Sequence, residues 1–268
     1  MDSGNHIIDH DLLRAYPGAE VVFDDAFVAL PGATGTPASL SGAIRSACES
    51  GRSWPVVLLA TGSRSFESPP ILARWLRHAG IEAALIAPAT QRVPNRPRYV
   101  SPTDAEIYAE VHRLRRWELD YTLARLAGHR CFDCSRLVVM GLSEGGVAAA
   151  TWRPTCNAPR LVMAWGIEDS YFARSFDLPQ DKTTPILNLM GWQDAYFGPH
   201  ESLSARDGVR GHGAERLATY PNARVVLYPS AGHKLLEHPQ TAEDVVTFLR
   251  RHLTTTETPS FPTLEDDQ

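Results

Sequence analysis

Three side chains that can act together in acyl-transfer chemistry stand far apart in the sequence: Ser143, Asp194 and His233. A serine hydroxyl becomes a strong nucleophile when a histidine takes its proton, and a carboxylate can hold that histidine in the correct tautomer. Ser143 lies in Gly141-Leu-Ser-Glu-Gly145, directly after an apolar run that begins at Leu137. Strand, tight turn and following helix would raise the hydroxyl above a sheet, so we expect Ser143 to be the nucleophile.

The partners of Ser143 are predicted from the points where strands end. Asp194 follows an apolar run at 185–190, and His233 follows another at 223–228. Because the carboxyl ends of parallel strands meet at one edge of a sheet, both residues would share that edge with Ser143. Each residue alone has an ordinary structural explanation, but the three in this order favour a catalytic triad.

Other residues could fill two of these roles. Glu168 and Asp169 follow an apolar run at 161–165 and could supply the acid, although the Gly-x-x-Asp setting of Asp194 favours the latter. His238, five residues after His233, falls at a predicted loop or helix start, and we expect it to be exposed to solvent.

A triad also needs two backbone N–H groups that stabilise the oxyanion of the tetrahedral intermediate. Glu144 directly follows the nucleophile and can supply the first. The second is expected from Ser63, in the loop after an apolar run at 55–60, where Gly62 permits close approach. The side chains of these two residues matter less to this role than their backbone.

Aromatic residues flank the candidate site in sequence and suggest an apolar or aromatic substrate group: Phe66, Trp192, Tyr196 and Phe197. Packing beneath loops explains them equally well. A proline-rich loop at 88–102 also carries arginines that could attract an anionic substrate, although a solvated loop is the favoured interpretation: Arg92, Arg96 and Arg98.

Apolar runs alternate with helical patterns over most of the chain. Strands are expected at 55–60, 81–87, 137–142, 161–165, 185–190 and 223–228, and helices at 68–79, 103–127, 147–152 and 241–253. A capping box of Thr103 and Glu106 should begin the long helix. This alternation predicts an α/β fold, a mostly parallel sheet with helices on both faces.

The two ends of the chain differ from this pattern. Residues 21–23 and 27–30 are predicted to form a hairpin, and 40–44 could be strand or helix. We expect one domain over 1–253, with its catalytic core at about 55–252. The acidic, threonine-rich segment 254–268 is predicted to be disordered.

Composition argues against several partners. The chain of 268 residues carries a formal net charge of −5, which does not favour nucleic acid or an anionic membrane. No apolar window approaches the length of a membrane span, and the first residues lack the pattern of a secretory signal. We therefore expect a cytoplasmic protein with neither nucleic acid nor a membrane as partner.

Cysteine and histidine spacing adds no metal site. Cys131 and Cys134 have CxxC spacing, which could be a disulfide, a redox pair or half of a zinc site, but two reduced packing thiols are favoured. His6 and His10 stand beside Asp9 and Asp11 with metal-like spacing, in a segment expected to be flexible. We predict no metal.

The set Thr61-Gly62-Ser63, Gly141–Gly146, Gly191–Asp194 and Ala231–His233 resembles the α/β-hydrolase superfamily over about 55–252. The compact branch similar to dienelactone hydrolases fits best, because only 166–184 is available for a lid. The resemblance implies a cofactor-free hydrolase acting through an acyl-enzyme. Two features depart from that branch: dienelactone hydrolases use a cysteine where this chain has Ser143, and the usual His-Gly of the oxyanion loop is Thr61-Gly62.

We expect a serine hydrolase, of carboxylesterase or thioesterase type, that cleaves a small carboxylic ester or thioester through an acyl-enzyme on Ser143. An acyltransferase, cyclase, lyase or small peptidase could use the same triad. Alternatives from other classes are a non-catalytic binding protein of the same fold and a redox protein using the cysteines. The substrate is expected to be a small molecule, and the oligomeric state is left open, with a homodimer as one option.

Overall fold

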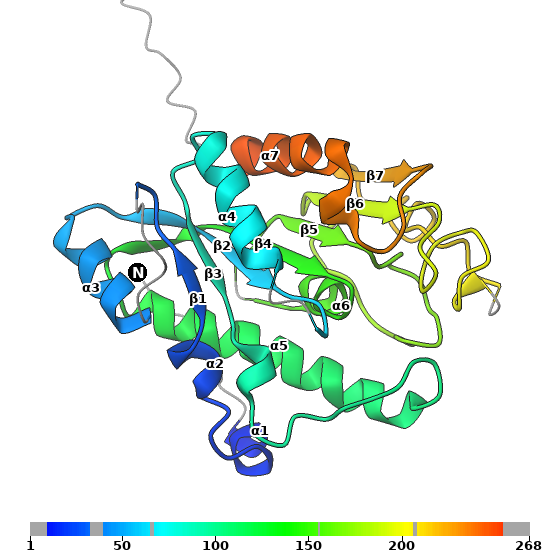
Figure 1. Cartoon of the computed structure of the whole chain (residues 1–268), viewed down its shortest axis with the longest axis horizontal. Coiled ribbons are helices and arrows are strands. Elements are labelled where there is room, and N and C mark those ends of the chain that lie inside the picture. Colours follow the sequence, from blue (N-terminus) through cyan, green and yellow to red (C-terminus); the bar gives the residue numbers. More distant parts are fainter. Residues whose placement is uncertain (1–9, 33–39, 65–66, 155, 206–207, 254–268) are drawn as a thin grey trace, which may run out of the picture.

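The computed structural model describes residues 10–32, 40–64, 67–154, 156–205 and 208–253 (Figure 1). Within them a seven-stranded sheet has the order β1-β3-β2-β4-β5-β6-β7. The strands are β1 Phe27–Ala29, β2 Trp54–Ala60, β3 Ala84–Ala87, β4 Phe132–Leu142, β5 Arg160–Met163, β6 Ile186–Gly191 and β7 Ala223–Tyr228. All neighbours pair in parallel except β1, which runs antiparallel to β3.

The strand order reverses beside β2. From β2 the chain passes to β3 on one side, and then to β4 on the other. Crevices at the carboxyl ends of strands next to such a switch point are the usual ligand sites of open α/β sheets. The candidate nucleophile and the candidate oxyanion loop follow β4 and β2, the two strands at this point.

Helices cover both faces of the sheet (Figure 1). Their bounds are α1 His10–Ala15, α2 Val21–Asp24, α3 Leu40–Glu49, α4 Ser68–His78, α5 Ala105–Ala127, α6 Glu144–Thr151 and α7 Pro239–Leu253. Alternate residues of β2 face opposite sides: Val56 and Leu58 pack with α5 and α6, while Val57 and Leu59 pack with α4 and α7. The predicted arrangement, a mostly parallel sheet with helices on both faces, is confirmed.

The predicted hairpin is wrong. Residues 21–24 form a helical turn, α2, which buries Val22 and Phe23 together in the core. A strand would have pointed these two neighbouring side chains to opposite faces, so burial outweighs their preference for strands. β1 pairs with β3 instead, and the ambiguous segment at 40–44 is part of helix α3.

The predicted capping box does not form. Helix α5 begins at Ala105 with Asp104 at its N-cap, and no side-chain capping hydrogen bond is present there. The Thr103 hydroxyl donates to the Val100 carbonyl, and the Asp104 carboxylate accepts from the Val100 N–H at 2.7 Å. Both side chains therefore close the turn before the helix, a local competition that these residue types commonly enter.

The prediction of two reduced thiols at Cys131 and Cys134 is wrong for Cys131. Cys131 forms a disulfide with Cys48 of α3, and their Cα atoms are 4.8 Å apart. Cys134 lies within β4 as a free thiol. The CxxC spacing drew attention to Cys134 as the possible partner of Cys131. The actual partner, Cys48, is 83 residues away in sequence and lies close because α3 packs at the beginning of β4.

Among the described residues, no helix has the length and apolar character needed to cross a membrane. Segment 254–268, predicted to be disordered, lies outside the described residues, as do His6 and Asp9. The described part of the chain holds no group of three His, Cys, Asp or Glu side chains that could bind a metal ion.

Candidate active site

Ser143 occupies a strained turn between β4 and α6. Its backbone φ of 53° and ψ of −116° lie where residues other than glycine are rarely found. The glycines on both sides allow the turn, because a Cβ on Gly141 would lie 2.0 Å from the Gly145 carbonyl oxygen. A Cβ on Gly145 would lie equally close to the carbonyl oxygen of Ala60. The turn is thus packed directly against the end of β2.

The structure brings Asp194 and His233 into contact. The Nδ1 atom of His233 lies 2.8 Å from Oδ2 of Asp194, whose side chain is fully buried. The other carboxylate oxygen accepts the backbone N–H groups of Tyr196 and Phe197 at 2.8 and 3.1 Å. A carboxylate can only accept, so Nδ1 carries the proton and Nε2 is left as the basic nitrogen.

The two loops that carry this pair are joined through their backbones. The N–H of Trp192 donates to the Tyr228 carbonyl, and the N–H of Gln193 donates to the Ala231 carbonyl, both at 2.9 Å. A Cβ on Gly191 would lie 2.4 Å from the Ala231 carbonyl oxygen, so only glycine permits this approach. The contact between Asp194 and His233 therefore rests on a rigid frame.

The alternative acids and base are engaged elsewhere. The Glu168 carboxylate accepts the backbone N–H groups of residues 210–212 at 2.5 to 3.0 Å, and Asp169 pairs with Arg216. His238 is half-buried rather than exposed as predicted, because its ring stacks on Tyr228 at 4.5 Å.

The candidate oxyanion donors come from adjacent strands. Ala60, the last residue of β2, pairs with Gly141 of β4, so the loop at 61–63 and the turn at Ser143 begin at the same level. Glu144 is the first residue of α6. The carbonyl of Thr61 accepts from the Arg115 guanidinium at 2.6 Å, and the carbonyl of Ser63 accepts from the Gln91 side-chain amide.

A buried set of charges lies behind the turn and was not predicted. The fully buried Glu144 carboxylate pairs with Arg96, lies 3.2 Å from Nε of Arg115 and accepts from the Tyr99 hydroxyl at 2.8 Å. Arg115 also pairs with Glu118, one turn along α5. The signal available in the sequence was this Arg–Glu pair at i,i+3 among the apolar residues of the helix.

The balance between burial and the neighbouring arginines shifts the pKa values of the Glu144 and Glu118 carboxyls in opposite directions. Burial alone pushes the pKa of Glu144 upward, but Arg115, Arg96 and the Tyr99 hydroxyl outweigh it, and the pKa lies below its usual value. Burial dominates at Glu118 and raises the pKa of its carboxyl despite Arg115. Glu144 is therefore the firmly ionised partner of the two arginines.

The three arginines of the proline-rich loop have different surroundings. The side chain of Arg96 is mostly buried against Glu144 and is not free to meet a substrate. Arg92 and Arg98 are exposed, in agreement with a solvated loop.

The predicted pocket residues separate into two kinds. Trp192 and Tyr196 are exposed by 42% and 43%, and the Tyr196 ring lies 4.8 Å from that of His233. Phe197 is buried and belongs to the core, with its ring 5.9 Å from His233. Phe66 lies outside the described residues.

The segment between β5 and β6 contains no helix or strand over 164–185. Its centre is fixed by aromatic packing: Tyr171 stacks on Phe197 at 5.9 Å, and Phe172 meets Tyr108 of α5 at 4.7 Å. The carbonyl of Phe172 accepts from Nε2 of His112 at 2.8 Å, and burial lowers the pKa of His112 to about 4. The segment thus packs against α5 and the loop of Asp194.

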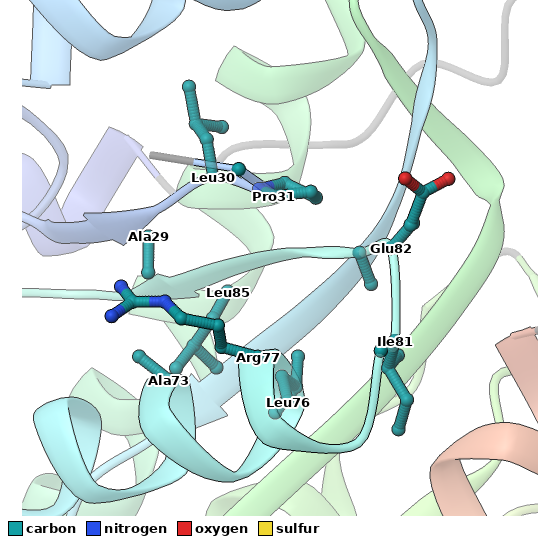
Figure 2. A pocket seen from close by; sticks show the side chains of 12 residues that line it. Ala29, Leu30, Pro31, Ala73, Leu76, Arg77, Ile81, Glu82 and Leu85 are labelled. Atoms are coloured by element: carbon teal, nitrogen blue, oxygen red, sulfur yellow. The ribbon is translucent and has the colours of Figure 1, made fainter. Parts of the chain in front are cut away.

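A pocket of about 170 Å³ lies away from this edge, between β1, α4 and the turn before β3 (Figure 2). Its charged side chains are Arg77 and Glu82, and Glu82 is paired with Arg52 at 2.6 Å. None of the candidate catalytic residues lines it.

No family model matches the chain, and no curated protein matches its sequence. Solved structures do match. Esterase PE8 is 16% identical with a TM-score of 0.55, covering 76% of this chain and 95% of its own. A carboxylesterase from Bacillus cereus (18%, TM-score 0.51) covers 74% and 89%, and TT1662 from Thermus thermophilus (18%, TM-score 0.51) covers 85% and 93%. The chain has the α/β-hydrolase fold.

The α/β-hydrolase fold confirms the fold class predicted from the sequence. The resemblance noted between the sequence motifs and this superfamily is thereby confirmed at the level of the fold. Because one fold hosts many activities, the function must be argued from the site.

Proposed function

We propose that the protein is a serine hydrolase that cleaves a small carboxylic ester or thioester through an acyl-enzyme on Ser143. The observation that carries the proposal is the 2.8 Å contact between His233 Nδ1 and the buried Asp194 carboxylate, at the edge of the sheet where Ser143 occupies its strained turn. The proteins of similar fold include ones described as an esterase and a carboxylesterase, which adds support.

In the acylation step, Nε2 of His233 takes the Ser143 proton as the hydroxyl oxygen attacks the substrate carbonyl. The backbone N–H groups of Glu144 and Ser63 stabilise the resulting oxyanion. His233 then gives its proton to the leaving alkoxide or thiolate, while Asp194 stabilises the imidazolium. The products of this step are the free alcohol or thiol and an ester on Ser143.

Deacylation repeats these steps with water as the nucleophile. His233 takes a proton from water, hydroxide adds to the acyl carbonyl, and the proton returns to the Ser143 oxygen as the acid leaves. Tyr196 is exposed beside His233, and Trp192 of the same loop is exposed as well, which supports hydrolysis over acyl transfer because transfer requires that water be kept out. The same two rings favour a small apolar or aromatic substrate group.

A non-catalytic role is less consistent with the backbone at Ser143. Backbone strain of this kind costs about 1–3 kcal/mol and persists mainly where it serves function. A binding protein of the same fold would have no need for a strained serine at the sheet edge that also carries the histidine and carboxylate pair.

Replacing Ser143 tests the proposal. We expect Ser143→Ala to lower kcat for activated short-chain esters by about 10⁴-fold or more, because the nucleophile is lost. A fluorophosphonate should modify the folded wild-type protein at Ser143 and leave the variant unmodified, as read by mass spectrometry. Unmodified wild-type protein, or unchanged turnover in the variant, would contradict the proposal. A panel of acyl and alcohol groups then defines the substrate.

A further inference from the structure

Arg115 lies in the middle of α5, yet its side chain is only 1% exposed and reaches both segments that carry the proposed oxyanion donors. Its guanidinium donates to the Thr61 carbonyl at 2.6 Å, and its Nε lies 3.2 Å from the Glu144 carboxylate. Arg115 touches neither Ser143 nor the pair of Asp194 and His233 in any of these contacts. Any effect of Arg115 on catalysis would therefore act through the position of the backbone at Thr61 and Glu144.

The first segment is the loop after β2. The N–H of Ser63 belongs to the peptide that joins Gly62 to Ser63, and peptides are planar. The carbonyls of the peptides on either side are both held, that of Thr61 by Arg115 and that of Ser63 by Gln91. Fixing both neighbours limits rotation of the peptide between them, and so fixes the direction of the Ser63 N–H.

The second segment is the start of α6. The Glu144 N–H is the other proposed donor, and the carboxylate of the same residue is fixed by Arg115, Arg96 and Tyr99. The turn at Ser143 also lies close to the Thr61 carbonyl, because a Cβ on Gly145 would lie 2.5 Å from the Thr61 oxygen. One guanidinium thus joins the two segments at their closest approach.

We propose that Arg115 is a positioning residue that sets the spacing and direction of the two oxyanion donors. The inference rests on the function proposed above, since the donors matter only if an oxyanion forms. Two different nitrogens of the planar guanidinium meet the Thr61 carbonyl and the Glu144 carboxylate, an arrangement that the single nitrogen of a lysine ammonium does not reproduce. A misplacement of about 1 Å at such donors can cost about 10²-fold in rate.

Three variants separate this role from simple structural support. Arg115→Lys keeps the charge and should lower kcat about 10²-fold with KM changed less than about threefold. Gln91→Ala frees only the Ser63 carbonyl and should give a smaller fall, about 10-fold. Glu118→Gln is the matched control: it removes the charge of the other buried partner of Arg115 but leaves the contacts of Arg115 with Thr61 and Glu144, so it should lower the melting temperature and keep kcat within about threefold.

The discriminating measurement is inhibition by a trifluoromethyl ketone, whose adduct with the serine carries an oxyanion. Its inhibition constant should weaken in proportion to kcat across the Arg115 and Gln91 variants. The acidic limb of the pH–rate profile should stay in place, because His233 and Asp194 are not disturbed. Circular dichroism and urea unfolding establish that each variant is folded.

The outcomes are distinct. Wild-type protein that a fluorophosphonate does not modify overturns the proposed function and the inference with it. Modified wild-type protein with folded Arg115→Lys of normal kcat and inhibitor affinity overturns the inference alone, as does an equal loss in Glu118→Gln. Should Arg115→Lys fail to fold, Gln91→Ala decides, and unchanged inhibitor affinity there overturns the inference.

Discussion

At the scale of single residues, the candidate site depends on backbone positions that tolerate no side chain. Gly145 illustrates this, because its α-carbon lies against the carbonyls of Ala60 and Thr61 at the end of β2. The turn at Ser143 and the loop of Ser63 can approach only because nothing extends from this position. The glycines of the motif are therefore a packing requirement as much as a conformational one.

Gly145→Ala is expected to damage the site. The added methyl would lie 2.0 Å from the Ala60 oxygen, so the turn or β2 must shift, and such overpacking typically costs about 1–3 kcal/mol. We expect ester turnover to fall by about 10²-fold or more, together with the free energy of unfolding measured in urea.

Gly128→Ala is the matched control. Gly128 ends α5 in a helical conformation, and its added methyl would make only an ordinary 3.4 Å contact with the Arg125 oxygen. Turnover and stability should remain near those of the wild type. Equal effects of the two substitutions would show that close packing at Gly145 is not what the site requires.

At the scale of elements, strand β4 connects the Cys48–Cys131 disulfide to the turn at Ser143. It begins directly after Cys131, which is bonded to Cys48 of α3, and ends directly before Ser143. The disulfide therefore fixes α3 to the end of β4 that lies away from the site.

Removal of this disulfide should affect stability more than activity. We expect Cys48→Ser to lower the free energy of unfolding by about 2–4 kcal/mol, because the disulfide closes a long loop in the unfolded chain. Turnover of activated esters below the unfolding transition should stay within about twofold. Cys156→Ser, at a free cysteine, is the control and should change neither quantity. A loss of activity matching the loss of stability would mean that the strand transmits disorder to the site.

The same elements show what the sequence could predict. Buried parallel strands are recognisable because both faces demand apolar residues, and Asp194 was found because it follows such a strand, β6. His233 follows β7, a half-buried strand at the edge of the sheet that is still recognisable from its apolar run. The disulfide, the helical turn at Val22 and the contacts of Arg115 depend on packing between distant segments. The spacing of neighbouring residues carries no information about such distant partners. The prediction of two reduced thiols at Cys131 and Cys134 was wrong for this reason, whereas the capping box at Thr103 was lost to hydrogen bonds with Val100.

At the scale of the whole molecule, folding lowers the pKa of two histidines by burying them, and the larger effect is at His112. His112 of α5 is buried, and burial lowers its pKa from 6.5 to about 4. The unfolded chain therefore binds a proton that the folded protein does not, between about pH 6.5 and pH 4. The stability is fully present above the unfolded pKa and is lost as the pH falls toward 4.

We expect the free energy of unfolding to fall by about 2 kcal/mol from this group between pH 7 and pH 5. His112→Gln does not titrate and should show a shallower dependence in urea titrations over that range. His78→Gln, at an exposed position of α4, should keep the wild-type slope. An unchanged slope in His112→Gln would mean that another group controls acid stability.

The position of β4 has one more consequence. Between Phe132 and Gly141 it runs alongside β2 from Trp54 to Ala60, with residues 134–136 out of register, so at about 3.3 Å per paired position these two ends are roughly 20 Å apart. Reagents that attack disulfides and reagents that acylate hydroxyls therefore meet opposite ends of a single strand. Reduction of the Cys48–Cys131 disulfide and acylation of Ser143 would therefore take place at sites separated by the length of β4.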